Sequence, residues 1–168
     1  MLTHKEARTI AEHELKSMAV IGDNGGLTIV DSATIEKPYA WIFFYNSKRY
    51  IDTGDIMHAL AGNAPLFISK LNGHISTFPT GLSIERMIDE YEEQEKAWEL
   101  ALTENIYSDM AKLLDMKRTL GLSKSNISEN KRSQNLVLDT GSATRLSSLQ
   151  KALSDKNIQT KLIERNIP

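Results

Sequence analysis

Two Asp-Thr-Gly tripeptides, Asp52–Gly54 and Asp139–Gly141, are the residues that most resemble catalytic machinery by type and spacing. In aspartic proteases, two such loops bring carboxylates together so that they share one proton. That arrangement needs extended β-structure in each lobe, whereas helical patterns dominate this chain after Ser83. Asp-Thr-Gly is also a common turn sequence. The two tripeptides are therefore interpreted as turns, and not as a protease site.

No other set of residues predicts catalysis or ligand binding. The four histidines (His4, His13, His58 and His74) lack the spacing of zinc ligands. The chain has no cysteine, which excludes disulfides, a thiolate nucleophile and cysteine-bound metal. No glycine loop is followed by Lys-Ser/Thr, and no nucleophile elbow is present. The sequence thus predicts a protein that is not an enzyme and has no cofactor or metal.

The composition is that of a soluble globular protein, with 168 residues, 40% of them hydrophobic and 25% charged. No apolar run is long enough to span a membrane, and the N-terminus has a polar helical pattern. A cytoplasmic location without membrane contact is the simplest prediction, and the lack of cysteine agrees with it.

The net charge of −2 conceals two oppositely charged parts. Residues 1–116 carry 10 basic and 18 acidic groups, whereas residues 117–168 carry 10 basic and 4 acidic groups. The basic part could contact an anion or fold back on the acidic part. Its basic residues are not interleaved with aromatic ones as in single-strand binders, which favours folding back and argues against a nucleic-acid partner.

The first half of the chain predicts an N-terminal helix followed by an antiparallel β-meander, which is the α+β class. Thr3 and Glu6 fit a capping box, and apolar residues then recur at helical spacing as far as Met18. Glycines at 22–26 predict a turn. Strands are expected at 27–30, 66–70 and 74–78, residues 34–37 are expected to lead into the central strand, and Asn72-Gly73 predicts a hairpin turn between the last two strands.

An aromatic stretch runs from Tyr39 to Tyr50, and its first seven residues are expected to form the central strand. It follows Pro38, and five aromatic residues lie within seven positions. Because successive side chains point to opposite faces and both faces are apolar, the strand is either covered on two sides or offers one side to a partner. A turn or bulge is expected at 46–49.

The second half predicts one long helix from residue 84 to Gly121, with a possible break at 103–105. Between 85 and 99 it carries seven acids and two bases, which form a solvated face or a partner surface. Residues 122–135 predict a linker. Residues 136–168 predict a small strand–helix–strand extension that docks on the α+β domain (1–121) or on a partner, because so short a segment cannot bury its own core.

Residues 37–93 resemble the YrhB-like immunity protein 35 family, and the match extends over about residues 1–95. The resemblance rests on the run Trp41–Ser47, on Leu60-Ala61-Gly62-Asn63-Ala64-Pro65, and on Thr80–Glu85 with the acidic Tyr91-Glu92-Glu93 behind it. It implies a small α+β domain whose bacterial relatives neutralise polymorphic toxins in bacterial competition. The family also includes a small chaperone, which leaves binding of unfolded clients as the alternative. The last 70 or so residues have no counterpart in it.

The expected function is therefore a stoichiometric complex with a cognate toxin. An acidic inhibitor suggests a basic target such as a nuclease. Aromatic anchors and acidic residues are the expected contact groups, because buried aromatics carry most interface affinity and charges set association rates. The candidates are Trp41, Tyr45, Tyr50, Trp98, Glu92, Glu93 and Glu95. For each tryptophan a core position is the competing interpretation. The sequence gives no expectation for the oligomeric state.

Overall fold

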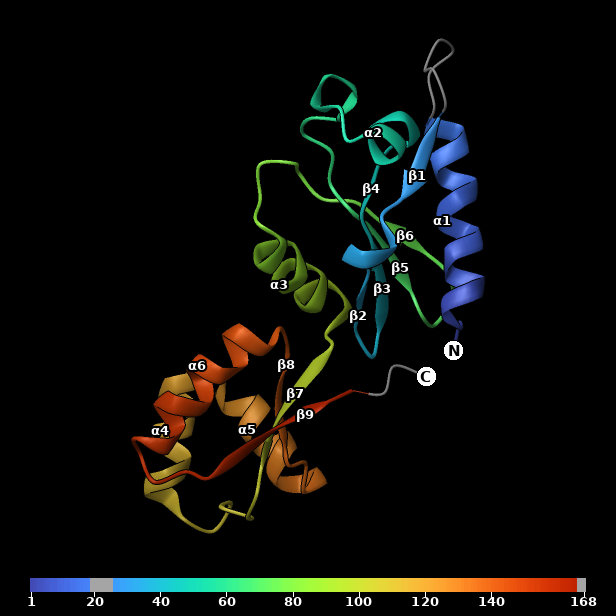
Figure 1. The fold of residues 1–168 in the computed structure, drawn as a ribbon. Coiled ribbons are helices and arrows are strands. Elements are labelled where there is room, and N and C mark those ends of the chain that lie inside the picture. Colours follow the sequence, from blue (N-terminus) through green and yellow to red (C-terminus); the bar gives the residue numbers. More distant parts are fainter. Residues whose placement is uncertain (19–25, 166–168) are drawn as a thin grey trace. The chain divides into compact units, whose positions relative to one another are not determined.

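The chain forms two units, Met1–Ile84 and Glu85–Arg165, in a computed structural model that describes residues 1–18 and 26–165 (Figure 1). Each unit combines helices with an antiparallel sheet, so the predicted α+β class is confirmed. Most of the predicted turn at 22–26 lies outside the described residues. The predicted boundaries at 121 and 135 fall inside the second unit, and separate folding of the predicted domains stays a prediction.

The first unit begins with helix α1 (His4–Met18), and the predicted capping box is confirmed. The Thr3 amide donates to Glu6 Oε2 over 2.8 Å, and the Glu6 amide donates to Thr3 Oγ1 over 3.3 Å. These two bonds satisfy amides that have no partner inside the helix. Ala7, Ala11 and Leu15 recur at four-residue spacing and are buried against the sheet.

The predicted meander is a four-stranded antiparallel sheet in the order β2-β3-β5-β6. Its strands are β2 (Ile35–Glu36), β3 (Ala40–Phe43), β5 (Leu66–Ser69) and β6 (Ile75–Ser76). The hairpin between β5 and β6 turns at Gly73, whose φ of 73° is the left-handed conformation that glycine adopts without strain. A separate pair joins β1 (Leu27–Ile29) to β4 (Tyr45–Ser47).

The prediction of one continuous strand over residues 39–45 is wrong beyond Phe43. Strand β3 ends there, and Tyr45 begins β4, which pairs with β1. Tyr50, beyond the predicted strand, lies in helix α2 (Lys48–Thr53). In place of the expected turn, residues 46–47 end β4 and residues 48–49 start this helix, which Ser47 caps because its hydroxyl accepts a hydrogen bond from the Tyr50 amide over 3.0 Å. The helix ends at Gly54, with φ of 70°, and the 3-10 turn η2 (Ile56–His58) follows.

The central position of β3 is confirmed, because it pairs with β2 on one edge and with β5 on the other. Phe43 points toward α1 and belongs to the core shared with that helix, whereas its neighbour Ile42 points away and is equally buried. On β5, Phe67 is buried as well, and its ring meets Phe78 edge-on at 4.9 Å. Both faces of the aromatic strand are therefore covered.

The second unit is built around a three-stranded sheet in the order β8-β7-β9. Its elements are α3 (Ile84–Glu95), β7 (Trp98–Leu102), α4 (Met110–Leu120), α5 (Lys124–Ser133), β8 (Val137–Gly141), α6 (Ala143–Ser154) and β9 (Thr160–Glu164). Both β8 and β9 run antiparallel to β7, so they are parallel to each other. The predicted strand–helix–strand unit therefore forms, with β7 inserted between its two strands.

The prediction of one helix from 84 to 121 is wrong. Helix α3 ends at Glu95, and Lys96 has a φ of 51°, which turns the chain out of the helix. Trp98, Leu100 and Leu102 then alternate along β7, and all three face the core of the second unit. Trp98 and Leu102 are also four residues apart, which fits a helix, so the apolar pattern alone is compatible both with the predicted helix and with the observed strand.

The predicted linker at 122–135 is wrong as local structure, because it contains helix α5. Ser123 caps α5 in a capping box with Asn126, and Ile127 packs against the core. A helix with one inward apolar residue has almost no periodicity, which explains why the sequence pattern did not show it. The core below it joins Met116 of α4 to Leu146 and Leu153 of α6, all fully buried.

Candidate partner-binding surface

Two of the predicted aromatic anchors have intramolecular roles in the first unit. Trp41 is half-buried, its indole Nε1 donates to the Leu2 carbonyl over 3.2 Å, and the Lys70 ammonium lies 4.3 Å from its ring centre. Tyr45 is buried in the core below α1, and burial raises the pKa of its phenol. Both residues therefore stabilise the fold of the first unit, on which any contact surface of this unit depends.

Trp98 is half-buried on β7 and packs against the core of the second unit. Its indole Nε1 is buried and has no hydrogen-bond partner among the described residues. Leaving a buried donor unpaired is costly, so the apolar packing of the ring must offset that cost. Tyr50, by contrast, is half-buried on α2, and the described part of the chain offers its hydroxyl no hydrogen bond.

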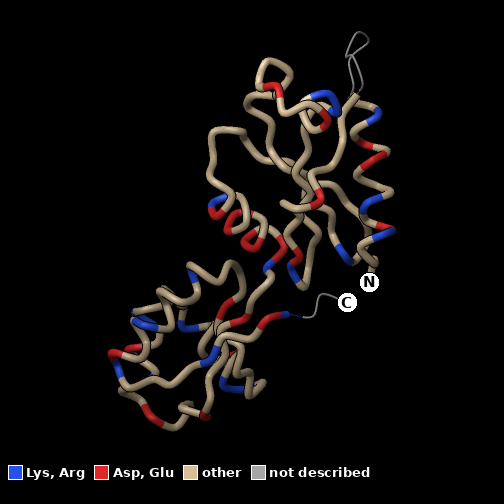
Figure 2. The backbone as a smooth tube through the Cα atoms, viewed as in Figure 1, with Lys and Arg blue, Asp and Glu red and all other residues tan. Residues whose placement is uncertain are grey.

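The acidic candidates all lie on α3, which carries six acids and one arginine and forms the densest acidic stretch of the backbone in Figure 2. Glu95 is exposed at the end of the helix. Glu92 is 5% exposed and its Oε2 accepts from the Ala143 amide over 2.9 Å. Glu93 Oε2 accepts from the Ser142 amide over 2.9 Å. Two α3 carboxylates thus bind the free amides at the start of α6, where the helix dipole favours negative charge.

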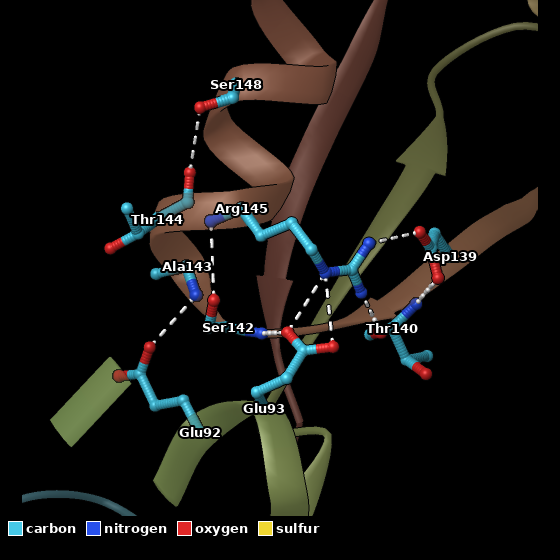
Figure 3. A network of polar contacts seen from close by, with 9 residues as sticks. All are labelled: Glu92, Glu93, Asp139, Thr140, Ser142, Ala143, Thr144, Arg145 and Ser148. Carbon is cyan, nitrogen blue, oxygen red and sulfur yellow. Dashed lines mark hydrogen bonds and ion pairs between the residues drawn. The ribbon is translucent and has the colours of Figure 1, made fainter. Parts of the chain in front are cut away.

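Arg145 completes this arrangement, which we call the Arg145 clamp (Glu93, Asp139, Thr140 and Arg145; Figure 3). Its Nε lies 3.0 Å from Glu93 Oε2, its Nη1 donates to Asp139 over 2.6 Å, and its Nη2 donates to the Thr140 carbonyl over 2.6 Å. Hydrogen bonds with Asp139 and Glu93 raise the pKa of Arg145, and the bond from Arg145 lowers the pKa of Glu93.

The clamp explains the second Asp-Thr-Gly tripeptide. A Cβ atom added at Gly141 would collide with Arg145 Nη2 and would lie 2.5 Å from Glu93 Oε2, so glycine leaves room for both side chains of this ion pair. In the first tripeptide, Asp52 pairs with Lys48 over 2.6 Å, and Gly54 ends α2. The interpretation of both tripeptides as turns is wrong, because Asp52 and Thr53 belong to helix α2 and residues 139–141 belong to strand β8. Each aspartate has an ion-pair partner nearby in the sequence, Lys48 for Asp52 and Arg145 for Asp139.

The predicted folding back of the basic part on the acidic part is confirmed. Arg145 pairs with Glu93, and Arg165 Nε lies 3.0 Å from Glu99 Oε1. Residues 1–84 hold seven basic and eight acidic groups, and residues 85–165 hold thirteen basic and fourteen acidic groups, so each unit has a net charge of −1. The charge asymmetry along the sequence is thus largely balanced within the second unit.

Among the described residues of the first unit, the most exposed apolar group lies at residues 50–58, which we call the 50–58 segment. Ile56 is 79% exposed, Met57 is 83% exposed and Ile51 is 43% exposed. Large apolar side chains gain free energy when they leave water, so adjacent exposed ones are typical of interaction sites. Sequence reasoning missed Ile56 and Met57, although two large apolar neighbours in a stretch without strand or helix periodicity were the available signal.

The backbone around this segment is held in place by side chains. Asp55 accepts from the Met57 amide over 3.0 Å and so caps η2. The Ser47 hydroxyl, which caps α2, also donates to the His58 carbonyl. Asn46 Oδ1 accepts from the Leu60 amide over 2.7 Å. The exposed side chains are therefore presented on a fixed backbone, which lowers the entropy lost on binding.

Within residues 1–18 and 26–165, no group of three or more histidine, aspartate or glutamate side chains is placed to hold a metal ion. No helix in the same part of the chain is both long and apolar enough to cross a bilayer. The described residues therefore form an α+β protein whose first unit presents an exposed apolar segment, residues 50–58, on a fixed backbone.

The chain belongs to the immunity protein 35 family, whose model matches residues 5–99. It is similar to the uncharacterized protein YrhB of Escherichia coli strain K12, with 30% identity over 92 residues, which cover 55% of this chain and 90% of YrhB. No solved structure matches. The predicted resemblance is thereby confirmed, and the matched region contains the whole first unit after its fourth residue, α3 and the start of β7.

Proposed function

We propose that this protein neutralises a cognate bacterial toxin by binding it in a stoichiometric complex. Membership of the immunity protein 35 family carries this proposal, because immunity proteins confer resistance to toxins and generally act without catalysis. The proposed setting is competition between bacteria that carry polymorphic toxins, with the protein acting in the cytoplasm of the cell that it protects.

We place the main contact at the 50–58 segment. Ile56 and Met57 are exposed and are held by a capped backbone inside the family-matched region, so they can act as apolar anchors. Tyr50, from the same segment, supplies an amphipathic ring of the kind enriched in interfaces. Trp41 and Tyr45 support this unit from within.

Acidic residues of α3 contribute attraction at a distance. Exposed carboxylates such as Glu95 increase the rate of encounter with a basic partner, and a nuclease is the proposed class of toxin because it must itself bind an anionic substrate. Glu92, Glu93 and Trp98 hold the second unit together, so their role in binding is to maintain the acidic helix in place.

The test is co-expression of this protein with the product of the gene next to it in a naive host, followed by copurification. Growth should stop with the neighbour alone and recover when both are present, with a stable complex of the two. The double variant Ile56→Asp/Met57→Asp should lose rescue and complex formation. Leu71→Asp, at a side chain that is 45% exposed in the same unit, is the matched control and should rescue growth normally.

The possible outcomes test the proposed function and the proposed contact surface separately. If the double variant protects as well as the wild type, the toxin binds elsewhere and the 50–58 segment is wrong as the contact. If the neighbouring product is harmless and this protein instead retains many unrelated unfolded proteins, the chaperone alternative replaces the immunity function. Exposed Ile56 and Met57 would then act as client-binding groups, and the same double variant would lower retention.

A further inference from the structure

A second exposed apolar surface lies between α4 and α5, outside the family-matched residues. Its apolar lining includes Met110, which is 67% exposed, Leu114, which is 47% exposed, and Ile127. Met110 and Leu114 are four residues apart, so they lie on one face of α4. We call this surface the α4–α5 groove. An open groove with exposed apolar side chains is a typical receptor for an amphipathic segment.

Lysines surround this groove. Lys117 of α4 and Lys124 and Lys131 of α5 line it, and the lining contains no acidic residue. None of the three forms an ion pair with a described residue, whereas Lys112 on the same helix α4 pairs with Glu104 over 2.7 Å. The groove therefore combines an apolar floor with three uncompensated positive charges.

We infer that the α4–α5 groove binds an acidic amphipathic segment of a partner protein, with apolar side chains one helical turn apart and carboxylates beside them. The apolar side chains would cover Met110 and Leu114, and the carboxylates would meet the lysines. A nucleic acid fits less well, because the lining has no aromatic side chain on which a base could stack. This inference is independent of the proposed toxin contact, which lies in the first unit.

The test measures binding of a fluorescein-labelled peptide to the full chain by fluorescence anisotropy. The peptide contains glutamate, alanine and leucine, with leucines three and four positions apart, and a scrambled peptide of the same composition lacks that spacing. The triple variant Lys117→Glu/Lys124→Glu/Lys131→Glu removes the lysine rim. The matched control, Lys151→Glu/Lys156→Glu/Lys161→Glu, changes three exposed lysines of the same unit that do not line the groove.

The amphipathic peptide should bind the wild type and the control alike, and the rim variant should bind about tenfold more weakly, which corresponds to about 1.4 kcal/mol for three exposed ion pairs. Leu114→Asn, which removes apolar contact without changing the charge, should weaken binding independently of salt. Equal loss in both triple variants, or equal binding of the scrambled peptide, would show attraction by net charge alone and overturn the inference. No binding, or a preference for a single-stranded oligonucleotide, would overturn it as well.

Discussion

The Arg145 clamp gives the sharpest prediction about this protein, through the substitution Glu93→Gln. Glutamine keeps the size and one oxygen of glutamate but loses the charge. In the wild type, the Glu93 carboxylate accepts from the Ser142 amide over 2.9 Å and from Arg145 Nε over 3.0 and 3.1 Å. In the variant, one of these donors faces an NH₂ group, and Arg145 keeps Asp139 as its only carboxylate partner.

The expected cost follows from the geometry. A hydrogen bond to a charged group contributes about 1.5–3 kcal/mol when it is shielded from water. The Glu93 side chain is 46% exposed, so solvent screening brings each contribution toward the roughly 0.2–1 kcal/mol of exposed ion pairs. Two weakened interactions then lower the free energy of unfolding by about 1–1.5 kcal/mol. Glu95→Gln, at an exposed carboxylate on the same helix, should change it by less than about 0.5 kcal/mol.

The assay is urea unfolding followed by tryptophan fluorescence. The chain has two tryptophans, Trp41 in the first unit and Trp98 in the second, so a Trp41→Phe background leaves Trp98 as a reporter of the unit that contains the clamp. Glu93→Gln and Glu95→Gln are compared in this background. The midpoint should fall for Glu93→Gln without a change in slope, because the same surface unfolds in both proteins.

The pH dependence tests the electrostatic cause. The pKa of Glu93 is lowered in the folded protein, so its stabilisation is fully present above the unfolded-state value of about 4.3 and is lost as the pH falls through the folded-state value. The difference between wild type and Glu93→Gln should therefore be constant from about pH 7 to 5 and shrink below about pH 4. A difference that persists unchanged at low pH, or one that Glu95→Gln reproduces, would refute the reasoning.

Two further predictions concern packing in the second unit. Gly141→Ala should destabilise it by about 1–3 kcal/mol, because the new Cβ would displace both Arg145 Nη2 and the Glu93 carboxylate 2.5 Å away. Gly81→Ala, where a Cβ meets nothing within 4 Å, should leave thermal unfolding almost unchanged, and equal effects would contradict this. Met116→Ala should cost about 2–5 kcal/mol through a core cavity, whereas Leu114→Ala, at a side chain 47% exposed, should cost under about 1 kcal/mol by urea unfolding.

Local sequence patterns predicted the strand that supports the candidate site, but they did not predict which side chains are exposed there. The aromatic run correctly predicted a central strand, since aromatic and β-branched residues favour a buried pleated surface. The turn expected after this run gave no sign that Ser47 would cap a helix that contains Tyr50. Exposure of Ile56 and Met57 depends on which residues lie above them, which composition does not specify.

By itself, the sequence determined the α+β class, the first helix with its Thr3–Glu6 capping box, the hairpin at Gly73 and the family. These features depend on neighbouring residues, whose capping, turn and periodic preferences are local. Only the tertiary structure decided that Trp98 starts a strand and that Glu93 binds α6, 49 residues further along the chain. An apolar pattern that fits both a helix and a strand is resolved by its partners, here β8 and β9, which follow much later in the sequence.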